Sequence, residues 1–177
     1  KQFANNTELF LRDEAVDEYG HRINFMIISI GIDYGATEGE TEFKATGITP
    51  MFKEAWTIDE EKLTGLHTPE QVYEAFINFY NRIVKDYGKV THCFADYGAL
   101  GQVLTYGLNR YLQQHGIPLK VQDCIKGQIN DRIYLDLMLF AQQRRFILKK
   151  CRYLIEAYKM AVWDDKHEDT RLDDGTT

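Results

Sequence analysis

The stretch Ile27–Thr37 decides how this chain folds, and it reads Ile-Ile-Ser-Ile-Gly-Ile-Asp-Tyr-Gly-Ala-Thr. It is apolar and β-branched up to a single carboxylate, Asp33, and small residues flank that carboxylate. Such a run between turn-forming residues predicts a buried strand over residues 24–33. Asp33 then ends the strand, where a carboxylate is either a turn former or a ligand at a sheet edge. Gly31 and Gly35 would let a metal or a phosphate approach the backbone closely.

The same pattern occurs a second time, because Ala95–Ala99 repeats the Asp-Tyr-Gly-Ala of Asp33–Ala36 after another apolar run. If the two strands are neighbours, Asp33 and Asp96 meet at one edge of the sheet. Clustered carboxylates repel each other and lose hydration, a cost that is tolerated mainly where a cation neutralises them. Taken alone, Asp-x-Gly is an ordinary strand-to-loop signature. The repetition favours a shared site for Mg²⁺ or Mn²⁺, which prefer oxygen ligands.

Length and composition restrict the class of protein. The 177 residues suit one domain with a substantial core, and 44% hydrophobic and 13% aromatic residues indicate a globular chain. A net charge of −6 argues against a protein that wraps nucleic acid non-specifically. Three widely spaced cysteines indicate neither a zinc site nor a disulfide framework, and no apolar run is long enough to span a bilayer. No phosphate-binding Gly-x-x-x-x-Gly-Lys-Ser/Thr motif occurs, so ATP hydrolysis is not expected of this chain alone.

Periodicity along the chain predicts an α/β domain. Three strands of an antiparallel meander come first, and helices and strands then alternate, which predicts a mixed sheet with helices on its faces. Residues 1–22 are expected to be a lead-in segment and residues 23–177 a single domain. Strands are expected at 24–33, 42–48, 51–58, 90–95, 119–121 and 145–148, and helices at 68–87, 99–114, 128–142 and 150–162.

The order and spacing of these motifs resemble the nuclease domain of the large terminase subunit, the DNA-packaging motor of tailed bacteriophages. The resemblance covers nearly the whole chain, although each motif is short. It implies a ribonuclease H-like fold with a mixed five-stranded, or slightly larger, sheet and helices on both faces. The stretches that carry the resemblance are Ile30–Gly35, Phe94–Asp96, Cys124–Gly127 with Asp131–Ile133, Trp163–Lys166 and Leu172–Thr176.

The resemblance implies an endonuclease that cleaves double-stranded viral DNA during genome packaging. Two divalent ions, Mg²⁺ or Mn²⁺, would hydrolyse the phosphodiester bond, with Asp33 and Asp96 as metal ligands. A third acidic ligand is expected at the start of the family's last helix, just past Thr177. Asp173 and Asp174 are the nearest acids that the chain contains, so they are its candidates for this third position.

The resemblance also implies partners and a location. Double-stranded DNA would be the substrate, and the ATPase domain of the same protein, the portal protein and the small terminase subunit would be partners. No membrane is implied. The protein would work in the host cytoplasm, on the assembling procapsid, and would not be secreted.

A few basic residues are candidates for contact with DNA. Lys126 precedes the helix expected at 128–142 and Arg132 lies in its first turn, where each could meet phosphate oxygens. Arg144 and Arg145 belong to the one basic cluster of the chain. For each of these residues the simpler alternative is a solvated surface position.

Other functions remain open at the level of sequence. Gly31–Thr37 also resembles the first phosphate loop of actin- and hexokinase-like ATP-binding folds, although those need two such domains and a separate adenosine loop. A non-catalytic docking domain could keep the same ribonuclease H-like shape. A junction-resolving or ribonuclease activity on this fold is a further alternative, because two aspartates do not specify the substrate.

Overall fold

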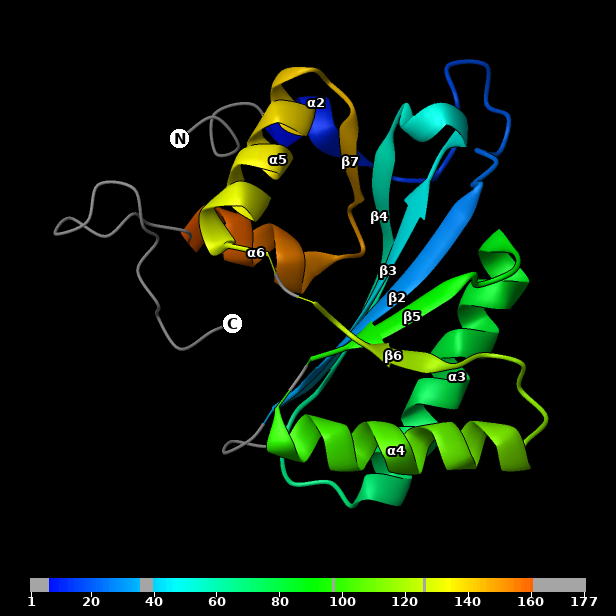
Figure 1. Ribbon diagram of the computed structural model, residues 1–177. Coiled ribbons are helices and arrows are strands. Elements are labelled where there is room, and N and C mark those ends of the chain that lie inside the picture. The colour runs from blue at the N-terminus through cyan, green and yellow to red at the C-terminus, as the bar shows by residue number, and fades with distance from the viewer. Residues whose placement is uncertain (1–6, 36–39, 97, 126, 161–177) are drawn as a thin grey trace, which may run out of the picture.

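A seven-stranded mixed sheet with helices on both faces forms the protein (Figure 1). The computed structural model describes residues 7–35, 40–96, 98–125 and 127–160. Within these residues, no helix is both long enough and apolar enough to cross a membrane. In chain order the elements are α2 (Thr7–Phe10), β1 (Leu11–Arg12), β2 (Ile27–Tyr34), β3 (Thr41–Ile48), a 3₁₀ turn (Pro50–Phe52), β4 (Ala55–Leu63), α3 (Pro69–Tyr87), β5 (His92–Ala95), α4 (Ala99–Gln114), β6 (Val121–Asp123), α5 (Ile129–Ala141), β7 (Arg145–Leu148) and α6 (Arg152–Met160).

The strand order across the sheet is β1-β7-β4-β3-β2-β5-β6. Strands β2, β3 and β4 form the expected antiparallel meander, and β5 and β6 lie parallel to β2 on its other side. Parallel neighbours need a crossover connection, which α3 and α4 supply. This arrangement confirms the predicted mixed α/β sheet. Strand β7 lies parallel to β4 and β1 parallel to β7, so two strands extend the five-stranded centre.

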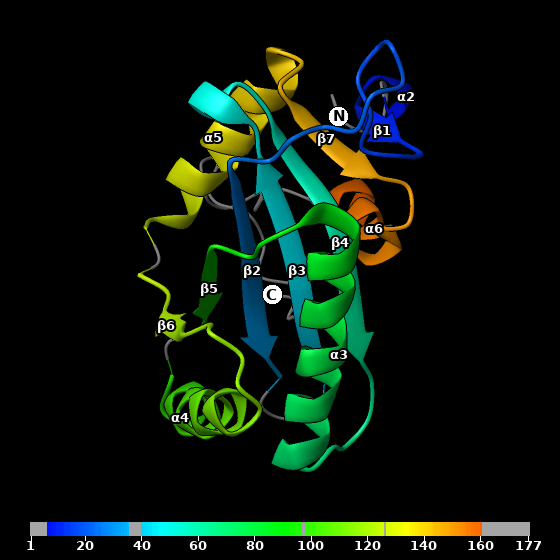
Figure 2. The ribbon, with the colours of Figure 1, turned by 90° about the vertical axis from the view of Figure 1, so that its right-hand side faces the viewer.

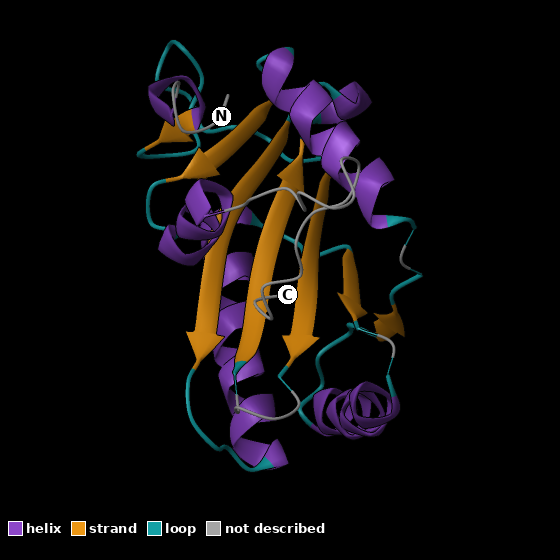
Figure 3. Ribbon diagram, turned by 90° about the vertical axis from the view of Figure 1, so that its left-hand side faces the viewer, coloured by secondary structure: helices purple, strands orange, loops and turns teal. Residues whose placement is uncertain are grey.

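The two faces of the sheet differ in what covers them. Along β2 the alternate residues Ile28, Ile30, Ile32 and Tyr34 are buried. Helix α3 lies across this face and α5 and α6 lie on the opposite one, while α4 stands beyond the lower end of β5 and β6 (Figures 2 and 3). Because side chains alternate along a strand, Asp33 belongs to the face opposite α3. Burying each large apolar side chain stabilises the fold by about 1.5–3 kcal/mol.

Helix α3 begins where the sequence predicts. The Thr68 hydroxyl accepts a hydrogen bond from the Gln71 N–H, and the Gln71 side chain accepts one from the Thr68 N–H. This reciprocal pair is the predicted capping box, which satisfies two backbone donors that the helix itself cannot use. It fixes the start of the helix that carries Phe76 and Phe79 onto the sheet.

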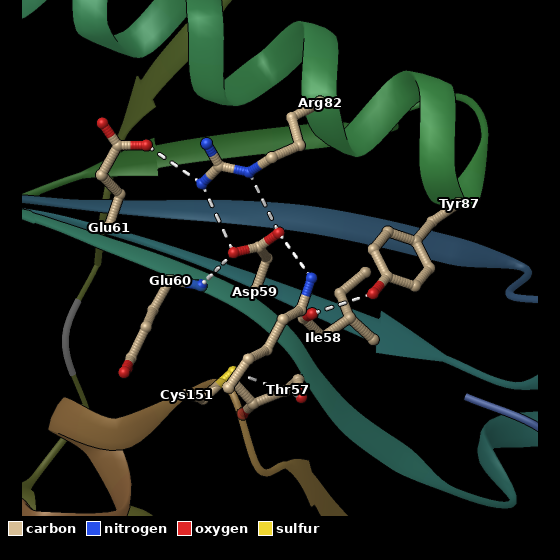
Figure 4. Close-up of polar contacts among 9 residues, drawn as sticks. Thr57, Ile58, Asp59, Glu60, Glu61, Arg82, Tyr87 and Cys151 are labelled. Carbon is tan, nitrogen blue, oxygen red and sulfur yellow. Dashed lines mark hydrogen bonds and ion pairs between the residues drawn. The ribbon is translucent and has the colours of Figure 1, made fainter. Parts of the chain in front are cut away.

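A buried ion cluster ties α3 to β4 and to the end of β7 (Figure 4). The carboxylate of Asp59 is only 5% exposed. It accepts hydrogen bonds from the Arg82 guanidinium at 3.2 and 3.4 Å and from Lys150 Nζ at 2.7 Å. Arg82 also donates to Glu61 at 3.0 Å. The cluster joins three elements from distant parts of the chain.

Two local expectations are wrong. The third strand begins at Ala55 rather than at residue 51, because Pro50–Phe52 forms a 3₁₀ turn in which Met51 has a φ of 61°. The apolar strand expected at 90–95 predicts that His92 is buried, but His92 is exposed, and its ring stacks on Phe94. The reason is strand alternation, which turns Cys93 rather than His92 toward the helices.

Candidate metal centre

Asp33 and Asp96 lie at the adjacent ends of two parallel strands. Ile32 of β2 is in register with Ala95 of β5, so the two carboxylate residues follow at the next position of each strand. The Asp96 N–H donates to the Ile32 carbonyl oxygen at 3.1 Å, which keeps this next position beside β2. Neighbouring strands are about 4.7–4.9 Å apart. The backbone therefore brings together the two residues that the sequence singled out.

Both aspartates lie on the sheet face opposite α3. Ile32, Ala95 and Tyr34 are buried on the face that α3 covers, and the alternation of strand residues gives Asp33 and Asp96 the other face. Each aspartate is partly buried. A carboxylate in this setting keeps some access to solvent and substrate while it loses part of its hydration.

A third acid, Glu42, stands beside Asp33, and the sequence analysis did not single it out. Glu42 of β3 is the direct partner of Asp33 in the antiparallel register. Directly opposed side chains share a face and have Cβ atoms about 4.5–5.5 Å apart, and like charges there destabilise the sheet. Lys62 of β4 offsets this repulsion, because its Nζ lies 3.5 Å from Glu42 and 2.6 Å from Glu40. The hydrogen bond to Glu40 raises the pKa of Lys62 above its ordinary value.

A fourth carboxylate on β4, Glu60, has a structural role. It accepts hydrogen bonds from the backbone N–H groups of Tyr153 at 2.6 Å and Leu154 at 3.1 Å, in the first turn of α6. Burial raises the pKa of Glu60 above its ordinary value, although these two donors and nearby Lys44 act in the opposite direction. Glu60 therefore fixes the start of α6 against the sheet.

Two glycines set the backbone around the aspartates. A Cβ on Gly35 would lie 1.8 Å from the Glu40 carbonyl oxygen, and one on Gly101 would lie 2.4 Å from the Asp96 carbonyl oxygen. Gly35 thus lets the backbone of Glu40 pack directly against the end of β2. Gly101 lets the first turn of α4 pack directly against Asp96.

Tyr34, the neighbour of Asp33, is buried and does not act as a base. Burial raises the pKa of its hydroxyl well above the ordinary value. Thr105 of α4 donates a hydrogen bond of 3.5 Å to that hydroxyl. Tyr34 therefore helps to hold α4 against the end of β2.

Asp173 and Asp174, the candidates expected for a third acidic ligand, lie outside the described residues. Within the described residues, no three histidine, cysteine, aspartate or glutamate side chains converge closely enough to hold a metal ion. Two carboxylates on adjacent strand ends are suitable oxygen donors for a hard divalent cation, but they form only part of a ligand set.

The four basic residues expected to contact DNA differ in their surroundings. Lys126 lies outside the described residues, and Arg132 is exposed in the first turn of α5. Arg144 donates to the carbonyl oxygens of Phe52 and Lys53 and so holds the 3₁₀ turn. Arg145 is 7% exposed. The Arg144 and Arg145 guanidiniums are thus engaged with the protein itself.

The contacts of Arg145 show why it is enclosed. Its guanidinium donates to Asp136 at 3.1 Å, to the Thr57 hydroxyl at 2.7 Å and to its neighbour's carbonyl, that of Phe146, at 2.9 Å. Asp136 also accepts from the Tyr158 hydroxyl. Arg145 therefore links β7, β4 and α5, and its partner Asp136 extends the link to α6.

Solved structures of other proteins share this fold. Neither a protein-family profile nor a curated protein matches the sequence. The structure superposes on the large terminase nuclease domain of bacteriophage P22 with a TM-score of 0.65 at 10% identity, over 94% of this chain and 80% of that one. For the SPP1 domain with bound Mn the TM-score is 0.57 at 12% identity, over 92% and 83%. For the G20c domain with bound magnesium it is 0.51 at 14% identity, over 85% and 74%.

The chain thus has the ribonuclease H-like fold of these nuclease domains. The superposition covers most of each chain, so the likeness extends beyond the central strands. At 10–14% identity it establishes the fold alone.

Proposed function

We propose that the protein is a divalent-metal-dependent endonuclease that cleaves double-stranded DNA, the nuclease part of a phage large terminase subunit. The observation that carries the proposal is the neighbouring position of Asp33 and Asp96 at adjacent parallel strand ends. The likeness to terminase nuclease domains, one with bound Mn and one with bound magnesium, supports the same chemistry.

Each acidic residue has a distinct part in this proposal. Asp33 and Asp96 hold the cation through carboxylate oxygens, with a third acid supplied from outside the described residues. Asp173 and Asp174 are the candidates within the chain. Bound there, two Mg²⁺ or Mn²⁺ ions would supply water activation and stabilisation of the leaving oxygen. Glu42 stands beside Asp33, but its ion pair with Lys62 offsets its charge, and it is not one of the proposed ligands.

The remaining assignments are those that the resemblance in sequence implies. Residues 23–177 form the nuclease domain, and residues 1–22 lead into it and add Leu11–Arg12 to the edge of its sheet. Its partners are the ATPase domain of the same protein, the portal protein and the small terminase subunit. Packaging of viral DNA in the host cytoplasm is the process it serves. Among the predicted DNA contacts that the structure describes, Arg132 has an exposed side chain.

Cleavage of supercoiled plasmid in Mn²⁺ tests the proposal. We expect Asp33→Asn and Asp96→Asn each to reduce cleavage more than about a hundredfold while the fold is retained. Asp86→Asn changes the same charge on the exposed end of α3 and is the matched control. Full activity in either active-site variant, or equal loss in the control, contradicts the proposal.

A further inference from the structure

A groove lies between the second half of α4 and the segment that leads into β6. Its volume is about 640 Å³, and its walls include Tyr106, Arg110, Gln113, Pro118 and Lys120. In Figure 1, α4 and β6 lie side by side and are joined by a short connection. No residue that lines the groove is acidic.

The two cations of this groove are available to a ligand. Arg110 and Lys120 are exposed, and neither side chain makes a hydrogen bond or an ion pair with another described residue. Their surroundings are unusual for this protein, whose net charge is −6, because residues 97–122 contain no aspartate or glutamate. A surface that carries cations and no carboxylates attracts a polyanion.

Asn109, which lines the groove, is bonded to the start of β6, and this restricts the kind of ligand that the groove can bind. The Asn109 side chain donates to the Val121 carbonyl oxygen at 2.9 Å and accepts from the Val121 N–H at 2.8 Å. These bonds occupy the backbone groups that β6, the last strand of the sheet, would offer to an added strand. A peptide that extends the sheet at Val121 is thus disfavoured, and a charged ligand held by side chains fits better.

Polar side chains on α4 connect the groove to the candidate metal centre. Gln102, Tyr106, Arg110 and Gln113 recur at helical spacing and share one exposed side of α4. The first turn of this helix packs against Asp96 through Gly101. At 1.5 Å per residue, Gln102 and Gln113 are about 16 Å apart, which corresponds to roughly five base pairs of duplex DNA.

We propose that this groove binds the phosphate backbone of duplex DNA about five base pairs from the bond that is cut. Arg110 and Lys120 contact phosphate oxygens, and the polar side of α4 follows the strand between the groove and Asp96. The inference rests on the proposed nuclease function, since it takes DNA as the ligand. It adds a second, metal-independent contact that fixes how the duplex lies across the site.

Binding of a fluorescent 30-base-pair duplex in EDTA, measured by anisotropy at several salt concentrations, tests this contact separately from cleavage. We expect Arg110→Gln/Lys120→Gln to weaken binding about tenfold and to reduce the slope of log K against log salt by about 1–2. Lys85→Gln/Lys89→Gln, which removes two exposed cations at the end of α3, is the control with the same charge change. Thermal melting checks that both variants are folded.

The possible outcomes separate the two proposals. Weaker duplex binding in the groove variant alone supports the phosphate contact. Equal weakening in both variants, or no weakening in either, overturns the contact. No weakening in either variant would favour a protein partner for the groove. If the unchanged protein does not bind duplex in EDTA, the groove contact fails, and plasmid cleavage in Mn²⁺ still decides the nuclease proposal. Plasmid cleavage that survives Asp33→Asn overturns the nuclease proposal but not the groove contact.

Discussion

The Asp96 N–H donates a 3.1 Å hydrogen bond to the carbonyl oxygen of Ile32, the residue before Asp33. This bond is one step beyond the Ile32–Ala95 pair, so it extends the parallel pairing of β2 and β5 to the carboxylates. The two aspartates therefore owe their proximity to a backbone interaction, which side-chain substitution leaves in place. Each can be changed without moving the other.

The first prediction is that Asp33 and Asp96 act as one unit. If both hold the same metal centre, the double variant Asp33→Asn/Asp96→Asn should cleave no more slowly than the slower single variant. The reason is that the effects of substituting residues that serve one step are strongly non-additive. Plasmid nicking rates for the three variants measure this. Independent sites would instead multiply the two defects.

A second prediction concerns the buried carboxylate of Asp59. Arg82→Gln and Lys150→Gln each leave it one cation, and both cations are about 40% exposed, so each change should cost only about 1 kcal/mol. The double variant leaves the carboxylate buried without a cation, and the cost should rise to about 3–5 kcal/mol. Urea unfolding measures the difference. A strictly additive result would mean that Asp59 does not depend on these partners.

A third prediction concerns Arg145. Because its guanidinium is buried among Asp136, Thr57 and backbone carbonyls, Arg145→Gln should lower the free energy of unfolding by about 3–5 kcal/mol. It should leave the salt dependence of duplex binding unchanged at a temperature where the variant is folded. Reduced salt dependence with normal stability would restore the original expectation of a DNA contact.

The fourth prediction is a pH dependence at Glu60, whose pKa burial raises in the folded protein. A raised carboxyl pKa means that the folded state takes up the proton first as the pH falls. The ionised group therefore costs stability at neutral pH, and this cost disappears as the pH drops below the unfolded pKa near 4.5.

Glu60→Gln removes that titration and keeps one acceptor for the first turn of α6. Relative to this variant, the unchanged protein should gain stability as the pH falls from 7 toward 4.5. Urea unfolding of both proteins across this range gives the difference. A difference that moves in favour of the variant on acidification would show that the bonds from Tyr153 and Leu154 outweigh burial.

The sequence predicted best what depends on local pattern. The repeated Asp-Tyr-Gly-Ala motif located both strand ends, and the Thr68 and Gln71 pair located the start of α3. Each of these signals lies within a few neighbouring residues. The mixed sheet followed from the order of the elements, because parallel strands require the helical crossovers that the chain contains.

What the sequence could not predict depends on pairing between distant segments. Glu42 stands beside Asp33 only because of the β2–β3 register, and shifting it by one residue would turn Glu42 to the other face. In the sequence, Arg145 belongs to a basic cluster that would be expected to be solvated. Only the packing of β4, α5 and α6 around it shows that it is buried. The only sequence signal was the apolar Phe146–Leu148 that follows it, which marks a buried strand rather than a surface loop.

Anomalous diffraction from a crystal soaked in Mn²⁺ tests the metal centre most directly. We expect a manganese peak within reach of the carboxylate oxygens of both Asp33 and Asp96, at roughly 2.0–2.1 Å as for Mg²⁺, and its loss in Asp33→Asn. Manganese bound elsewhere with none at these two aspartates would contradict it.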